Sequence, residues 1–132
     1  MNFNTHGFRA TPWLLSLVIS LHAGLAQADD MDYLLHTTPS ERATSQTHFM
    51  QSQLGLTADT TAQVQQINQK YAEKLEPVIK GSSNRISKMM DMKEIQQQKE
   101  AELQKLLTAT QFDTYQNSKD ALKAAMQHDL QH

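Results

Sequence analysis

Apolar residues beyond residue 38 recur at steps of three and four, the spacing that places side chains on one face of an α-helix. Glu, Gln and Lys fill most of the positions between them. The clearest apolar stripe consists of Val64, Ile67, Tyr71, Leu75 and Val78. No segment shows the alternation of apolar and polar residues that is typical of a strand. The pattern therefore predicts an all-α fold.

Capping residues divide this pattern into separate helices. The first helix is predicted to start after Thr38, with Pro39 at its first position and Glu41 completing a capping box. It is expected to end near residue 54, because Gly55 can adopt the left-handed conformation that terminates many helices.

A helical hairpin is expected to follow. Its first helix starts after Thr57, and Pro77 should kink it or end it early because proline lacks a backbone donor. The sequence Gly-Ser-Ser at residues 81–83 then connects it to a helix over residues 84–107. A last helix is predicted from residue 109 to about 127, with its inward positions at Phe112, Tyr115, Leu122 and Met126.

The start of the last helix carries a motif in which each residue has a helix-capping role. Thr108 is the predicted N-cap, and Gln111 can return a hydrogen bond to it. Leu107 and Phe112 flank the cap as a hydrophobic staple, which fixes the angle between successive helices. The motif therefore predicts a structural corner.

An approximate second copy of this corner stands at Leu56 and Thr57. Thr60 replaces the glutamine there, and Asp59 in the first turn complements the helix dipole. We expect this second corner to be structural as well, and weaker than the first.

The N-terminal segment resembles a secretory leader. It has a single basic residue, Arg9, then an apolar run over residues 13–25 and the small-x-small sequence Ala-Gln-Ala at residues 26–28. The run is too short for a spanning helix, so we expect cleavage after Ala28, no stable membrane anchor and a periplasmic protein. The predicted organisation is a signal peptide over residues 1–28, a flexible arm over 29–37, a helical domain over 38–127 and a tail over 128–132.

Composition narrows the function classes. The chain has 132 residues and no cysteine, which excludes disulfides and thiol chemistry. Few aromatic residues favour thin helices that share a narrow seam, and small domains of this kind gain burial by forming a homodimer. A formal net charge of −2 with mixed signs predicts no binding to nucleic acid.

The sequence resembles the LTxxQ-motif periplasmic proteins, the Spy/CpxP-like family, between about Pro39 and Met126. Besides the two corners, the likeness is carried by Pro39-Ser40-Glu41-Arg42-Ala43, Leu54-Gly55-Leu56-Thr57, Ile67-Asn68-Gln69-Lys70-Tyr71-Ala72 and the segment from Leu107 to Tyr115. The resemblance implies a helical hairpin that dimerises into a thin bundle or cradle in the periplasm of a Gram-negative bacterium. It also implies ATP-independent binding of unfolded or envelope proteins, or damping of an envelope-stress sensor kinase.

A methionine-rich segment is the main candidate for contact with such proteins. Its apolar residues are Ile86, Met89, Met90 and Met92. Three interpretations stay open: packing within the hairpin, an adaptable surface for apolar clients, and a soft-metal site.

Metal binding and catalysis are the remaining function classes. His128 and His132 are weak candidates for zinc or copper binding in a metal-sensing or buffering domain, the alternative function. We predict no cofactor, and we predict no enzymatic activity because the sequence lacks a Gly-rich phosphate loop and an HExxH motif.

Overall fold

A computed structural model describes residues 26–129 and, within them, the side chains of residues 31–124. This part of the chain forms five α-helices and no strand, which confirms the all-α prediction. The helices are α1 (Ala26–His36), α2 (Pro39–Leu54), α3 (Ala58–Lys80), α4 (Arg85–Leu106) and α5 (Ala109–Asp129). The predicted leader lies outside the described residues except for its last three.

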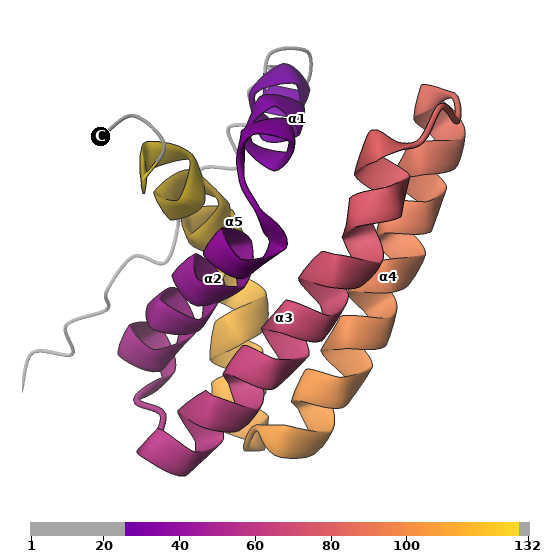
Figure 1. The fold of residues 1–132 in the computed structure, drawn as a ribbon. Helices are drawn as coiled ribbons and strands as arrows, with labels where there is room; N and C mark the ends of the chain where they lie inside the picture. Colours follow the sequence, from indigo (N-terminus) through magenta and orange to yellow (C-terminus); the bar gives the residue numbers. More distant parts are fainter. Residues whose placement is uncertain (1–25, 130–132) are drawn as a thin grey trace, which may run out of the picture.

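The helices pack as a long hairpin with three flanking helices (Figure 1). α3 and α4 form the hairpin, α2 packs along α3, and α5 returns from the far end of α4 to pack on α2. α1 contacts α5 and α3. The turn between α3 and α4 projects beyond α2 and α5, so the first turns of α4 have α3 as their neighbour.

Eight buried apolar side chains from all five helices and their corners form one core. They are Tyr33, Met50, Leu56, Val64, Leu103, Leu107, Tyr115 and Leu122. Full burial of one such side chain contributes roughly 1.5–3 kcal/mol, so burial of this cluster strongly favours assembly of the bundle. The predicted stripe on α3 contributes Val64 directly, and Tyr71 is buried nearby at 5% exposure.

The predicted limits of α2 are confirmed. The Thr38 hydroxyl accepts a hydrogen bond from the backbone N–H of Glu41 at 3.2 Å, and the Glu41 carboxylate accepts one from the Thr38 N–H at 2.8 Å. At the other end Gly55 is left-handed with φ of 61°, a conformation that L-residues with a side chain adopt at a cost.

The predicted hairpin turn is present, although α3 does not end at Pro77. The helix continues to Lys80, where the Gly81 N–H bonds the Pro77 carbonyl at 2.9 Å. A β-carbon on Gly81 would lie 2.8 Å from that carbonyl oxygen, so the backbone needs a glycine here. Asn84 caps α4, which begins at Arg85, one residue after the predicted start.

The prediction of a flexible arm over residues 29–37 is wrong, because residues 26–36 form α1. Tyr33 is only 6% exposed and belongs to the core, and the Thr37 hydroxyl donates to its carbonyl at 2.7 Å. The large apolar residues of α1 cluster between residues 31 and 35, so the sequence shows no repeating stripe. The helix is held by tertiary contacts, which periodicity does not reveal.

No helix among residues 26–129 is long and apolar enough to cross a membrane.

Candidate functional site

The corner before α5 has the predicted hydrogen bonds. The Gln111 N–H donates to the Thr108 hydroxyl at 3.2 Å, and the Gln111 side-chain carbonyl accepts from the Thr108 N–H at 3.1 Å. Leu107 is buried, and Phe112 packs against the core. The Gln111 amide also donates to the carbonyl of Leu54 at 3.4 Å, so this residue ties the α4–α5 corner to the end of α2.

The second corner is capped by a different set of bonds. Thr57 caps α3 by accepting from the Thr60 N–H at 3.3 Å, and its hydroxyl also donates to the Thr60 hydroxyl at 3.0 Å. The threonine side chain at position 60 is shorter than glutamine. Leu56 is buried at 7% exposure, so this corner is also anchored in the core.

The four candidate contact residues on α4 fall into two groups. Ile86, Met89 and Met90 are 73%, 51% and 67% exposed, so packing within the core does not explain them. Met92 is half-buried and points to a cavity between the helices.

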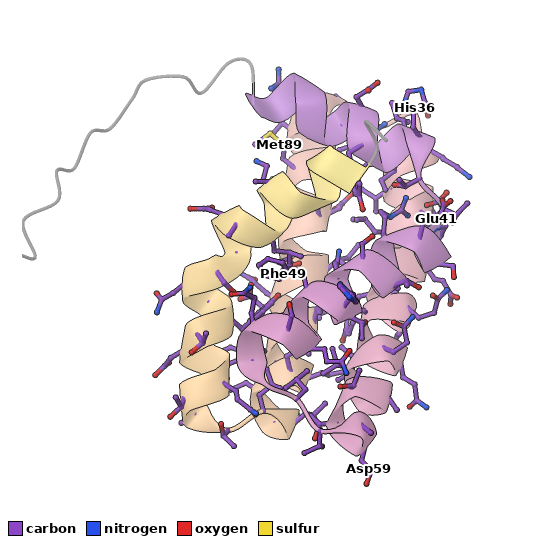
Figure 2. All side chains as sticks on the ribbon, turned by 90° about the vertical axis from the view of Figure 1, so that its left-hand side faces the viewer. His36, Glu41, Phe49, Asp59 and Met89 are labelled. Atoms are coloured by element: carbon purple, nitrogen blue, oxygen red, sulfur yellow. The ribbon has the colours of Figure 1, made fainter. Side chains whose placement is uncertain are left out.

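The three exposed residues share one face of α4. They are spaced by three and four, so Met89 and Met90 lie one turn beyond Ile86. We call these three residues the α4 patch. Figure 2 places Met89 near the opposite end of the molecule from Asp59, which lies in the first turn of α3. The patch therefore lies toward the projecting end of the hairpin, away from the Leu-Thr corners.

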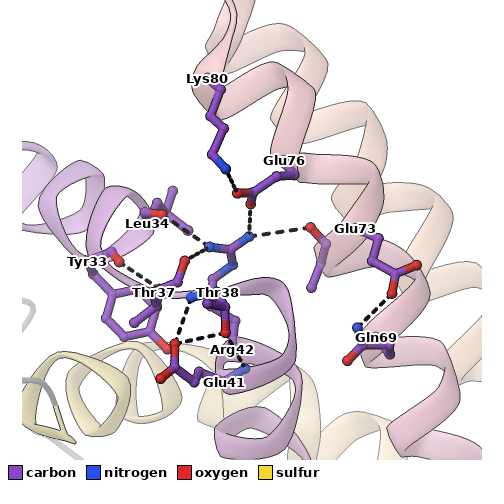
Figure 3. A network of polar contacts seen from close by, with 11 residues as sticks. Tyr33, Leu34, Thr37, Thr38, Glu41, Arg42, Gln69, Glu73, Glu76 and Lys80 are labelled. Carbon is purple, nitrogen blue, oxygen red and sulfur yellow. Dashed lines mark hydrogen bonds and ion pairs between the residues drawn. The ribbon is translucent and has the colours of Figure 1, made fainter.

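A buried arginine connects α1, α2 and α3 (Figure 3). Arg42 is 1% exposed and donates to the carbonyls of Leu34 at 3.1 Å and Thr37 at 2.6 Å. It also forms an ion pair with Glu76 at 2.5 Å. Hydrogen bonds from Lys80 and Arg42 hold the pKa of Glu76 below its usual value, so the pair stays ionised at neutral pH.

A second buried cation lies on α4. Lys99 is 6% exposed and donates to the side-chain carbonyl of Gln46 on α2. Burial lowers the pKa of Lys99 to about 8. Among the described residues, no carboxylate forms an ion pair with its ammonium group. Lys99 thus differs from Arg42, whose charge is neutralised by Glu76.

Lys99 lines a cavity of about 350 Å³ that we call the Lys99 cavity. The lining combines apolar and charged side chains from α1, α2, α4 and α5, namely Tyr33, Leu34, Gln46, Gln96, Lys99, Glu100, Tyr115, Lys119, Leu122 and Lys123. A neighbouring cavity of about 320 Å³ lies toward Arg42 and Met92. The two cavities share Leu34, Gln46, Gln96 and Lys99 as lining residues.

Positively charged side chains outnumber negatively charged ones among the described lining residues of the Lys99 cavity. Burial raises the pKa of Glu100, but hydrogen bonds from Gln96 and Lys119 outweigh it, so the pKa is lowered and the group is anionic. Its ion pair with Lys119 measures 2.9 Å. Burial raises the pKa of Tyr115 to about 12, which keeps the phenol neutral. The lining residues within the described part of the chain therefore include three lysines and one carboxylate.

Sequence reasoning missed this interior because residues 96–100 are polar and resemble a solvated helix face. The signal that could have found it is helical phase: counting back from Leu103 by four and by seven gives Lys99 and Gln96 on the same buried face. Lys70 pairs with Glu102 at 2.6 Å across the hairpin rather than with a neighbour on α3.

The histidine candidates for metal binding, His128 and His132, have side chains outside the described residues. Within the described residues, no group of three His, Asp or Glu side chains is placed to hold a metal ion.

Comparison with known proteins gives one match. A family model described as Domain of unknown function (DUF4890) matches residues 26–115, from the start of α1 to Tyr115 in α5. The match spans both Leu-Thr corners, the α4 patch and most of the lining of the Lys99 cavity. No curated protein and no solved structure matches the chain.

Proposed function

The chain belongs to the family described as Domain of unknown function (DUF4890), and from its geometry we propose that it is a periplasmic interaction protein. It binds exposed apolar segments of unfolded or envelope proteins without ATP, in the manner of a chaperone or a stress adaptor. The leader-like residues 1–28 support the location, and the resemblance of the two corners to LTxxQ-motif proteins supports the class of activity.

The α4 patch is the observation that carries this proposal. Ile86, Met89 and Met90 leave more than half of their surfaces in water, at a position where α3 is the neighbouring helix. Methionine is unbranched and polarisable, so it adapts to apolar partners of varied shape. Such a surface suits clients that have no fixed structure.

The size of the patch favours an unfolded segment over a second copy of the chain. A stable dimer buries about 800 Å² on each partner, contributed by 20–30 residues. Three apolar side chains on two helical turns fall far below that requirement. Weak, reversible contact with short apolar segments is what such a patch can supply, and any dimer must use another surface.

Suppression of client aggregation tests the proposal. A chemically unfolded client is diluted into buffer with a several-fold excess of the processed protein, and light scattering is followed. Suppression is expected for the wild type. It should be lost in the triple variant Ile86→Ser, Met89→Ser and Met90→Ser.

Leu35→Ser is the matched control, because Leu35 is also apolar and 57% exposed but lies on α1. It should suppress aggregation as well as the wild type. The proposal fails if the wild type does not suppress aggregation, or if the triple variant suppresses it fully.

A further inference from the structure

We propose that the Lys99 cavity is a binding site for a small amphipathic carboxylate with one apolar chain. Its carboxylate would bind the Lys99 ammonium, and its chain would lie against Tyr33, Leu34 and Leu122. This site lies between α1, α2, α4 and α5 and is separate from the α4 patch.

The polar half of the argument is an incomplete set of partners for a buried charge. An ammonium group has three N–H donors, and Gln46 accepts one of them. Buried charges are normally paired, because an ion without a partner is costly to remove from water. A carboxylate supplies both the opposite charge and two acceptor oxygens.

Arg42 is a weaker candidate for the same role. Its guanidinium already binds the Glu76 carboxylate and three backbone carbonyls. The charge at Lys99 has no comparable partner among the described residues, so an incoming anion gains more there.

The shape of the cavity sets the size of the ligand. Its volume of about 350 Å³ is within the range of small-molecule sites. That volume is enough for a medium-chain carboxylate and too little for a phospholipid with two chains.

The remaining lining agrees with an anion that has an apolar body. Tyr33 and Leu34 on α1 and Tyr115 and Leu122 on α5 provide apolar surface. Lys119 neutralises Glu100, the one carboxylate among the lining residues that the structure describes, so the charge of Lys99 is left in excess. A cationic or neutral ligand of the same shape would leave the positive charge of Lys99 without a counter-ion.

Isothermal titration calorimetry with decanoate tests the site, with the neutral decan-1-ol as the comparison ligand. The processed protein is first refolded from guanidinium chloride to remove any molecule carried through purification. We expect decanoate to bind with a one-to-one ratio and at least tenfold more tightly than decan-1-ol.

Lys99→Met should weaken decanoate binding at least tenfold, whereas Lys105→Met, a control at an exposed position late in α4, should not. Circular dichroism of each variant verifies that it is folded. Absence of decanoate binding, equal affinity for the alcohol, or full binding by Lys99→Met would overturn the proposal. The triple variant of the α4 patch should bind decanoate like the wild type, so failure of the proposed function leaves this result unaffected.

Discussion

Replacing Lys99 by methionine is expected to stabilise the ligand-free protein at neutral pH. The side chain is 6% exposed, and its one hydrogen bond within the described part of the chain goes to Gln46. Methionine has a similar length and no charge, so it can occupy the same space without the cost of removing an ion from water.

The pKa of Lys99 gives the size of the effect. A fall from 10.5 to about 8 corresponds to about 3 kcal/mol of destabilisation of the charged form. Loss of the hydrogen bond to Gln46 offsets about 1 kcal/mol of this gain. The free energy of unfolding of Lys99→Met should therefore exceed that of the wild type by about 2 kcal/mol at pH 7.

The difference should shrink as the pH rises. Because the pKa of Lys99 is lower in the folded state, the unfolded chain binds more protons between pH 8 and 10.5, and wild-type stability rises with pH there. From pH 7 to 9.5 this gain is about 2 kcal/mol. Lys99→Met lacks the titrating group and should show no such gain.

Urea unfolding followed by circular dichroism at the two pH values measures both quantities. Staying below pH 10 keeps Tyr71 and Tyr115, whose pKa values burial raises to about 12, from contributing in the folded state. Lys105→Met should follow the wild type at both pH values. A Lys99→Met variant that is less stable than the wild type at pH 7, or a difference independent of pH, would refute the reasoning.

Four further predictions concern the corners, the buried arginine, the hairpin turn and the leader. Thr108→Ala should lower the free energy of unfolding by about 1 kcal/mol, and by more than Thr57→Ala, because only the first corner has a reciprocal bond; equal losses in urea unfolding would contradict this. Arg42→Met should cost about 1–3 kcal/mol in the same assay, since it leaves the carbonyls of Leu34 and Thr37 without their donor and removes one of the two cations that bind the partly exposed Glu76 carboxylate. A near-neutral effect would count against the network. Gly81→Ala should cost about 1–3 kcal/mol, because the new β-carbon meets a carbonyl oxygen of the preceding turn at 2.8 Å; unchanged thermal melting would show that the turn can relax. Intact mass spectrometry of the protein exported to the periplasm should show cleavage after Ala28, and an uncleaved chain would disprove the leader.

Local chemistry made the helix limits predictable. Thr38, Gly55, Thr57, Asn84 and Thr108 each act within one helical turn, so their roles can be recognised from neighbouring residues alone. The apolar stripe on α3 was predictable for the same reason, because apolar residues at steps of three and four indicate which face of the helix is buried.

Long-range contacts were not predictable in this way. α1 is stabilised by burial of Tyr33 in the core and by a hydrogen bond from Arg42 on α2. The sequence of α1 alone does not indicate either contact. Lys99 lies in a polar segment typical of an exposed face, and only its phase relative to Leu103 places it inside. The exposure of Met89 likewise depends on where the other helices end.

The most direct test of the proposed function is nuclear magnetic resonance of the processed protein with ¹³C-labelled methionine methyl groups. An unfolded client is added in increasing amounts, and each methyl resonance is followed. Met89 and Met90, which are exposed on the α4 patch, should shift or broaden, while Met50, 1% exposed in the core, should not. Unchanged Met89 and Met90 resonances in the presence of the client would contradict the account.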